Sequence, residues 1–298
     1  MPAEAAIGNA AVEALKNLDP HPGVAKPDPV LVADGVVRQF GGLRAVDVSH
    51  LEVQRGAITA LIGPNGAGKS TFFNVISGFD TANEGTWRYN NQTITKTAPN
   101  KLARKGLVRT FQLTKSLSRL TVLQNMLLGA KGQTGENLFS AIFKFSWSAQ
   151  EQANTKRAME LLGRFNLAQK SADFAGSLSG GQRKLLEMAR ALMLNPDLVM
   201  LDEPMAGVNP ALKQSLLDHI RDIREEGTTV MFVEHDMDMV RDVSDWVVVM
   251  AQGAIISEGT PASVMRDQRV IDAYLGAHHD EALTDSGQSL TTAEETDA

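Results

Sequence analysis

A glycine-rich segment that directly follows a short apolar run limits the possible folds of this chain more than any other feature. The run Ile58–Ile62 has the length of a buried strand, and a helix is predicted from about Lys69 to Ser77. The residues between match the pattern G-x-x-x-x-G-K-S/T, whose glycines let backbone N–H groups turn around phosphate oxygens. The positive N-terminal end of the helix attracts the same anion, so the segment predicts a phosphate-binding loop. Its residues are Gly63, Pro64, Asn65, Gly66, Ala67, Gly68, Lys69 and Ser70.

Two side chains at the end of this loop predict a nucleoside triphosphate with Mg²⁺. Lys69 can reach the β- and γ-phosphates, and the Ser70 hydroxyl can bind the metal. A chance match is the alternative, because four fixed positions recur about once per hundred chains of this length. The strand before the loop and the helix after it favour the phosphate site.

An acidic pair follows a second apolar run, Leu198–Leu201. Neighbouring residues of a strand point to opposite sides, so Asp202 and Glu203 can have different roles. One carboxylate can bind Mg²⁺ while the other polarises an attacking water. An isolated acidic pair would be interpreted as a solvated loop start, and the phosphate loop makes the catalytic interpretation the better one.

The pentapeptide Leu178–Gln182 opens another predicted helix with one serine and two glycines. Such a helix start offers backbone N–H groups to an anion. By itself the Ser-Gly-Gly sequence is equally typical of a linker, and it gains weight only beside the phosphate loop and the acidic pair.

The second half of the chain alternates buried strands with helices. The strand Leu198–Leu201 is followed by a helix that Asn209 caps and Gly227 ends, and then by the strands Thr229–Val233 and Val247–Met250. This order predicts an α/β fold with a mostly parallel sheet, whose ligand site lies at the carboxyl ends of the strands.

Composition excludes several classes of function. The chain has no cysteine, which excludes disulfides and cysteine-zinc sites. It carries 29 basic and 35 acidic residues, and with no basic excess we expect no nucleic-acid partner. No apolar stretch reaches the roughly 18 residues of a membrane-spanning helix, and no basic leader with an apolar core opens the chain. We therefore expect a cytoplasmic location.

Both ends differ from the body of the chain. Residues 1–29 are alanine-rich and then interrupted by prolines, which predicts a flexible extension with at most a short helix near Ala10–Leu18. Residues 280–298 are acidic and rich in Ser, Thr and Ala, which predicts a disordered tail.

Taken together, these motifs resemble the ATP-binding subunit of an ATP-binding cassette (ABC) transporter over roughly residues 31–276. The segment Ala206–Asn209 ends with Asn209, and many members of that family carry Asp at this last position. The stretches that carry the resemblance are Phe40, Gly63–Ser70, Gln112, Leu178–Gln182, Leu198–Glu203, Ala206–Asn209 and His235.

The resemblance implies a P-loop NTPase fold within residues 30–279. It adds to the mostly parallel sheet an N-terminal antiparallel β-subdomain and an α-helical subdomain at about 113–180. The resemblance identifies Leu178–Gln182 as the family's signature segment. It also implies that two such cassettes enclose two ATP molecules head to tail, each between one phosphate loop and the partner's signature segment.

Residue roles follow from the resemblance as expectations. Phe40 would stack on adenine, and Lys69, Ser70 and Thr71 would hold the phosphates and Mg²⁺. Asp202 and Gln112 would complete the metal shell. We expect the catalytic residues to be Glu203 as general base, His235 against the γ-phosphate, and Gln112. We expect the partner's ATP to be closed off by Ser179, Gly180, Gly181 and Gln182.

Within the family, the chain resembles the LivG-type ATPases of branched-chain amino-acid uptake, and an apolar insertion matches at Leu138–Trp147. This implies two transmembrane permease subunits, a second ABC ATPase (a paralogue or a second copy), an extracytoplasmic solute-binding protein, and a position on the inner face of the cell membrane. Urea, amide and lipopolysaccharide-export ATPases share parts of the pattern. Two further alternatives are a soluble ABC-type ATPase acting on nucleic acid or ribosomes, and a nucleotide sensor without turnover. The other matching stretches are Phe40–Val46, Arg109–Gln112, Glu234–Met237 and Val270–Gly276.

Overall fold

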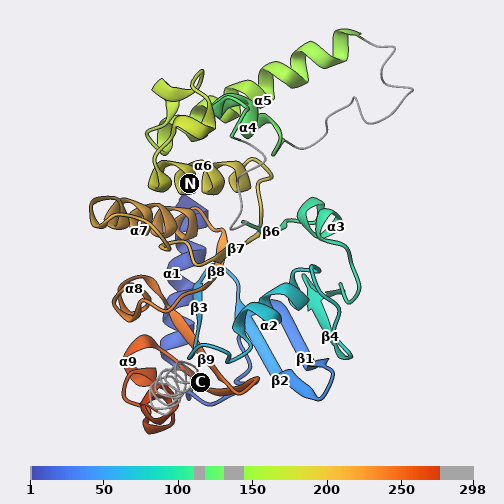
Figure 1. Cartoon of the computed structure of the whole chain (residues 1–298), viewed down its shortest axis with the longest axis vertical. Coiled ribbons are helices and arrows are strands. Elements are labelled where there is room, and N and C mark those ends of the chain that lie inside the picture. Colours follow the sequence, from blue (N-terminus) through green and yellow to red (C-terminus); the bar gives the residue numbers. More distant parts are fainter. Residues whose placement is uncertain (1, 111–117, 131–143, 276–298) are drawn as a thin grey trace, which may run out of the picture.

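Two β-sheets and a set of helices make up the structure, a computed structural model that describes residues 2–110, 118–130 and 144–275 (Figure 1). One sheet has the order β10-β9-β3-β8-β7-β6, and the other, antiparallel sheet has the order β2-β1-β4-β5. The strands are β1 (Pro29–Phe40), β2 (Leu43–Gln54), β3 (Ile58–Ile62), β4 (Glu84–Tyr89), β5 (Gln92–Thr93), β6 (Leu107–Arg109), β7 (Leu198–Asp202), β8 (Thr229–Val233), β9 (Trp246–Ala251) and β10 (Ala254–Gly259).

Helices occupy most of the remaining described chain. Among the described residues between 118 and 177, the regular elements are α4, α5 and two short 3₁₀ turns, which lie inside the helical subdomain expected at about 113–180. The labelled helices are α1 (Pro2–Lys16), α2 (Lys69–Ile76), α3 (Pro99–Arg104), α4 (Val122–Leu127), α5 (Lys144–Arg164), α6 (Gly180–Leu192), α7 (Pro210–Glu225), α8 (Met237–Val243) and α9 (Pro261–Val264), with 3₁₀ turns at Ala168–Lys170 and Ala175–Ser177, and residues 268–275 are also helical.

The six-stranded sheet is mostly parallel, because β9 pairs with β3, β3 with β8, β8 with β7 and β7 with β6 in parallel, and only β10 pairs antiparallel with β9. The predicted α/β class with a parallel core and a separate antiparallel β-subdomain is confirmed. In the described part of the chain, no helix is both long enough and apolar enough to span a membrane.

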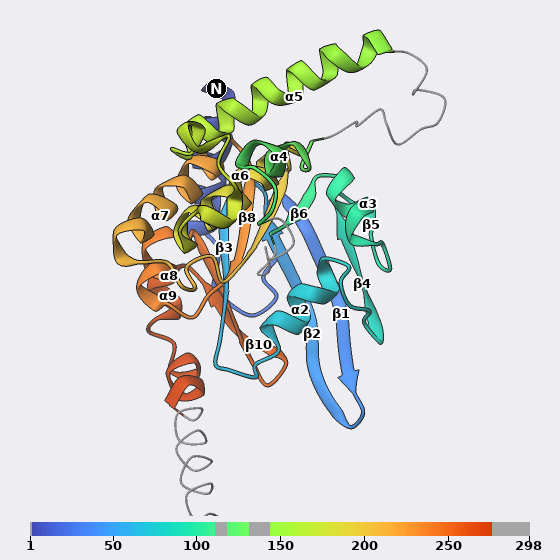
Figure 2. The ribbon, with the colours of Figure 1, turned by 45° about the horizontal axis from the view of Figure 1, so that its top comes forward.

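Both faces of the six-stranded sheet are covered. In β7, Val199 and Leu201 pack into a core formed with α4 to α8, whereas Leu198 and Met200 pack into a second core with α2 and the antiparallel sheet. Strands buried on both sides need apolar residues at every position, which explains the continuous apolar runs in the sequence. As Figure 2 shows, α2 lies between the two sheets, and α5 extends away from them.

The N-terminal segment packs on the body of the protein, which differs from the flexible extension that the sequence predicted. A 15-residue helix, α1, replaces the short helix expected near Ala10–Leu18, and Leu15 and Val24 are buried in the core around the antiparallel sheet. The prolines interrupt helix formation, as expected, but the chain between them is held by contacts from residues more than 200 positions away. The predicted acidic tail, 280–298, lies outside the described residues.

A buried ion pair holds this segment. Lys26 Nζ lies 2.8 Å from Glu258 Oε2, and the two side chains are 1% and 0% exposed. Glu258 also accepts the backbone N–H groups of Gly23 and Val24 and the indole N–H of Trp246. All described polar partners of the Glu258 carboxylate are therefore donors, which offsets the cost of burying its charge.

We predict that Glu258→Gln lowers the free energy of unfolding by about 3–5 kcal/mol, because it leaves the Lys26 charge buried and places an NH₂ group against N–H donors. Urea denaturation followed by circular dichroism measures this. The matched control is Glu13→Gln, which removes a surface pair with Lys16 and should change the stability by less than about 0.5 kcal/mol. Equal effects of the two substitutions would contradict the anchoring role of the buried pair.

Candidate active site

The phosphate loop lies between β3 and α2 and depends on glycine at two positions. Gly63 has φ 148° and Gly68 has φ 95°, both in the region that favours glycine. A Cβ on Gly63 would lie 2.0 Å from the Met250 carbonyl oxygen, and one on Gly68 would lie 2.2 Å from that of Ala45. Both distances are far shorter than any non-bonded contact, so only glycine fits. The loop is thus packed against β9 on one side and β2 on the other.

The helix after the loop starts without a side-chain cap. Gly68 is the N-cap of α2, and as a glycine it supplies no capping side chain to the first turn. Phe72 and Phe73 are buried and fix the helix between the two sheets. The N–H groups at this helix start are therefore placed to bind an anion, with the exposed Ser70 beside them and the half-buried Thr71 next in the chain.

Lys69 folds back over the loop. Its ammonium group donates to the carbonyl oxygens of Gly63, at 2.7 Å, and Pro64, at 2.9 Å. Burial lowers the pKa of Lys69, and the nearby Glu203 carboxylate acts in the opposite direction. A phosphate on the loop would act as a further negative neighbour, so ligand binding is expected to stabilise the charged lysine.

Asp202 and Glu203 lie at the carboxyl end of β7, as predicted, and their backbones differ in conformation. Asp202 still pairs with Val233 of β8, whereas Glu203 has a positive φ of 44° and turns out of the strand. The Glu203 N–H donates to the Val233 carbonyl at 3.0 Å, and the Lys184 ammonium lies 3.3 Å from the Glu203 carbonyl oxygen. A non-glycine residue in this conformation is uncommon and is often found at functional sites.

The guanidinium group of Arg109, at the end of β6, fixes the Asp202 carboxylate. It donates to Asp202 Oδ2 at 2.6 Å, to Asn74 Oδ1 at 2.7 Å and to Ser77 Oγ at 2.9 Å. Arg109 and Asp202 are about one-tenth exposed, so the pair is poorly screened by solvent. In the sequence, Arg109 stands out only as part of the matching stretch Arg109–Gln112, which indicates no role for it. Through these hydrogen bonds, Arg109 connects Asp202, at the end of β7, to Asn74 and Ser77 at the end of α2.

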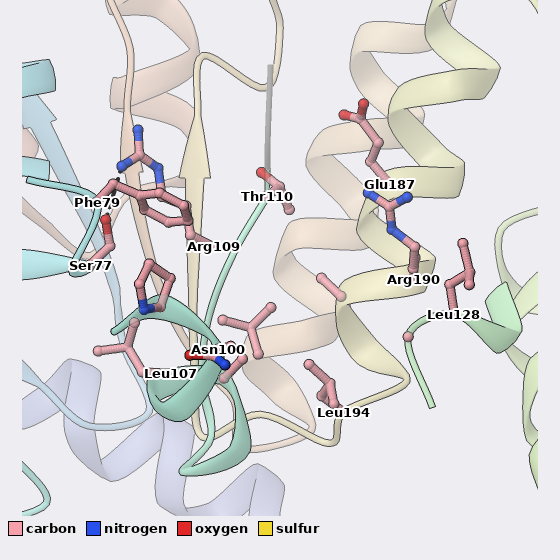
Figure 3. Close-up of a pocket in the computed structure, with 15 residues that line it drawn as sticks. Ser77, Phe79, Asn100, Leu107, Arg109, Thr110, Leu128, Glu187, Arg190 and Leu194 are labelled. Carbon is pink, nitrogen blue, oxygen red and sulfur yellow. Dashed lines mark hydrogen bonds between the residues drawn. The ribbon is translucent and has the colours of Figure 1, made fainter. Parts of the chain in front are cut away.

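Arg109 also borders a pocket of about 440 Å³ between α3, β6 and α6. Figure 3 shows this pocket with the side chains that line it. Phe79 and Leu128 are exposed apolar residues in its wall; Phe79 lies on one side of the pocket, and Leu128 lies on the other side with Arg190 and the buried Glu187. The residue after Arg109, Thr110, lines this pocket and also a smaller cavity beside Asp202. The pocket and the acidic strand tip therefore share one wall.

His235 follows the end of β8 and is 68% exposed on its side chain. Its Nδ1 lies 3.7 Å from Glu234 Oε2, beyond hydrogen-bond distance, so the imidazole is available to a ligand. The predicted Gln112 lies outside the described residues, as do residues 138–143 of the predicted apolar insertion Leu138–Trp147.

The predicted signature segment forms the start of α6. Ser179 caps the helix by accepting the N–H of Gln182, and the Gln182 side chain accepts the N–H of Ser179. Gly180 begins the helix, and a Cβ on Gly181 would lie 2.4 Å from a methyl of Leu212. In Figures 1 and 2, α6 and α2 lie apart, so this chain does not bring its own signature segment to its phosphate loop.

Phe40 ends β1 and is half exposed, with the Arg38 guanidinium 4.3 Å from its ring centre. An exposed aromatic ring of this kind can stack on a base. It lies on the antiparallel β-subdomain, whose strand β2 contacts the phosphate loop through Ala45.

The oxygen donors at the site suit Mg²⁺. Among the described residues, no three His, Cys, Asp or Glu side chains form a metal-binding cluster, so the metal would depend on few protein ligands. Asp202 supplies a carboxylate and Ser70 a hydroxyl, which are hard oxygen ligands, and Mg²⁺ commonly takes one or two protein ligands with the rest from phosphate and water. The residues present therefore fit this metal.

Comparison with known families identifies the class of protein. Residues 46–206, more than half of the chain, match the family model of the ABC transporter. The chain belongs to the ATP-binding proteins of the ABC transporter family. Residues 254–280 match a second model, described as a branched-chain amino acid ATP-binding cassette transporter. As a member of this family, the chain is an ATPase that binds nucleotide.

Curated relatives match nearly their whole length. A probable branched-chain amino acid transport ATP-binding protein, LivG, from Archaeoglobus fulgidus is 38% identical over 252 residues, which are 85% of this chain and 97% of the relative. The high-affinity branched-chain amino acid transport ATP-binding proteins BraF of Pseudomonas aeruginosa and LivG of Escherichia coli are 38% and 37% identical over 250 residues, each 83% of this chain and 98% of the relative.

Solved structures agree with the sequence matches. A nucleotide-free ATP-binding cassette from an ABC transporter and an ABC cassette in its ADP conformation each align with a TM-score of 0.73 at 38% identity. Both alignments cover 83% of this chain, with 98% and 99% of the respective structure. The described fold and this family agree.

We predict that Lys69→Ala weakens ATP binding about 10- to 100-fold, since a charge-assisted hydrogen bond of roughly 1.5–3 kcal/mol is lost. Affinity is measured by titration with a fluorescent ATP analogue. Lys105→Ala, which removes a surface lysine bonded to Gln92, is the control and should leave affinity unchanged.

The pH dependence has a defined sign. Burial lowers the pKa of Lys69 in the free chain, and a bound phosphate raises it again. ATP affinity should therefore fall as the pH rises through that lowered pKa, and the fall should be absent in Lys69→Ala.

Unchanged nucleotide affinity in Lys69→Ala would contradict the assignment of the loop.

Proposed function

We propose that this chain is the ATP-hydrolysing motor subunit of an ABC importer for branched-chain or other amino acids. The observation that carries the proposal is the near full-length similarity to proteins named as branched-chain amino acid transport ATP-binding proteins. The match of residues 254–280 to a model of the same description supports the same solute class.

We infer a partner set of two transmembrane permease subunits and a second ABC ATPase, a paralogue or a second copy, arranged head to tail. An extracytoplasmic solute-binding protein would act through the permease. The separation of α6 from α2 supports the need for a second cassette, because one chain presents a phosphate loop and a signature segment that do not meet. The chain would lie on the cytoplasmic face of the cell membrane.

In the proposed site, each ATP lies between two chains. Phe40 stacks on the adenine, while Lys69, Ser70, Thr71 and the loop N–H groups hold the phosphates. The partner's Ser179–Gln182 segment contacts the same ATP from the other side. Hydrogen-bond donors fixed before the reaction stabilise the charge that develops on the transferring phosphoryl group. This stabilisation is the main source of rate enhancement in such sites.

Hydrolysis replaces the bond between the β,γ-bridging oxygen and the γ-phosphorus by a bond from water to that phosphorus. Glu203 accepts the proton of the water, and His235 contacts the γ-phosphate. Ser70, Asp202 and Gln112 would hold Mg²⁺, which supplies charge neutralisation to the phosphates when bound. ADP and phosphate leave, and the two cassettes separate, which changes the state of the permease.

We predict that Glu203→Gln retains ATP binding and lowers the ATPase rate by about 10²- to 10⁴-fold, since the amide cannot accept the proton. In cells that lack the gene, uptake of labelled leucine should be restored by the wild-type chain and not by this variant. Glu225→Gln, a surface change at the end of α7, is the control and should restore uptake.

Near-normal hydrolysis by Glu203→Gln would overturn the assigned base. The deletion strain could instead take up leucine, isoleucine and valine normally and lose uptake of urea or an amide. That result would support the role as a transport ATPase and contradict the assignment of amino acids as the solute.

A further inference from the structure

A buried carboxylate joins two loops of the candidate site. Glu234 directly follows β8 and is 1% exposed. Its Oε1 accepts the backbone N–H of Met205 at 2.9 Å, and its Oε2 accepts the backbone N–H of His235 at 3.1 Å. Met205 is two residues after Glu203, so one side chain contacts both the segment after the general base and the residue that faces the γ-phosphate.

These bonds continue the sheet beyond its last strand pair. The β7–β8 ladder ends where Asp202 pairs with Val233, and the Glu203 N–H still donates to the Val233 carbonyl. The chain then turns away at Glu203, which has a positive φ, and the next bond to the β8 side is made by the Glu234 side chain. Glu234 therefore holds the segment after Glu203 at the point where backbone pairing stops.

The other side of His235 is also fixed. Asp236 accepts the Lys213 ammonium of α7 at 2.8 Å and the Met239 N–H at 3.2 Å, which caps α8. His235 thus lies between two carboxylates with defined partners, while its own imidazole is exposed. The backbone on both sides of His235 is held, and the ring alone is left to meet a ligand.

We propose that Glu234 is a positioning residue that couples the segment 204–208 to His235. This deepens the proposed function and rests on it. Segment 204–208 leads to Asn209 and α7, and a shift of Met205 must move the Glu234 carboxylate or break its bond. Because the same carboxylate holds the His235 backbone, the position of the imidazole depends on the conformation of the segment after Glu203.

The substitution Glu234→Gln separates this role from a purely structural one. The amide keeps one acceptor and turns an NH₂ group toward one of the two N–H donors, so one bond is lost. We expect the ATPase rate at saturating ATP to fall about 10- to 100-fold, as for a small misplacement of a group at a reacting centre. ATP affinity, measured separately by fluorescent-nucleotide titration, should change less than about twofold because the phosphate loop is untouched.

The decisive readout is a double-mutant cycle with His235→Ala, carried out on the full chain purified with the subunits that accompany it. If Glu234 acts through His235, adding Glu234→Gln to His235→Ala causes no further loss of rate. Glu234→Asp, which keeps the charge but is one methylene shorter, should show the same dependence on His235. Thermal unfolding of each variant checks that it is folded.

Asp245→Asn is the matched control, since the Asp245 side chain is also largely shielded from solvent, at 11% exposed, and accepts a backbone N–H, that of Ile58, at the opposite end of β3. It should lower stability and leave the rate at saturating ATP unchanged. This inference alone would be overturned if Glu234→Gln lowered the ATPase rate by the same factor in the wild-type chain and in His235→Ala. A wild-type ATPase rate in Glu234→Gln would also overturn it. A wild-type preparation without turnover would overturn the proposed function and this inference with it.

Discussion

The close approach of two backbone carbonyls to the phosphate loop is the constraint on which the rest of the structure depends. Gly63 lies against the Met250 carbonyl of the parallel sheet, and Gly68 lies against the Ala45 carbonyl of the antiparallel sheet. The turn between β9 and β10 completes the frame, because the Gly253 N–H donates to Ala67 and the Asp47 N–H donates to Gly253. The loop conformation is therefore set by both sheets together, and it is a product of the whole fold.

Main-chain or buried partners fix several of the polar groups around the loop before any ligand arrives. Arg109 fixes the carboxylate of Asp202, and the Val233 carbonyl fixes the turn at Glu203. Such fixed groups need little rearrangement when charge develops on a phosphoryl group, which is the physical advantage of building the site at the tips of parallel strands. Ser70 and His235 are instead exposed.

Local sequence patterns predicted the elements that carry the chemistry. The strand β3, the helix α2, the acidic end of β7 and the capped start of α6 could all be located because each is determined by residues within about ten positions. The α/β class followed from the alternation of strands and helices. The placement of Gln112 stays a prediction, since that residue lies outside the described part.

What the sequence could not predict depends on pairs of residues far apart in the chain. Arg109 and Asp202 are 93 positions apart, and Lys26 and Glu258 are 232 apart, so neither pairing has a local signal. The same holds for the N-terminal segment, whose prolines and alanines are typical of a flexible extension until Glu258 and Trp246 are brought beside it. Glu234 was visible only as part of a matching stretch, because its two partners are backbone N–H groups and carry no sequence signature.

The central claim, that this chain is the ATP-driven part of a membrane transporter completed by a second cassette, is tested most directly by its native assembly. The tagged full chain is purified from detergent-solubilised membranes of its own host, and every co-purifying protein is identified. We expect membrane-spanning permease subunits together with a second ABC cassette, either a paralogue or an untagged copy of this chain. Recovery of the chain with no membrane-spanning partner, alone or on ribosomes or DNA, would contradict it.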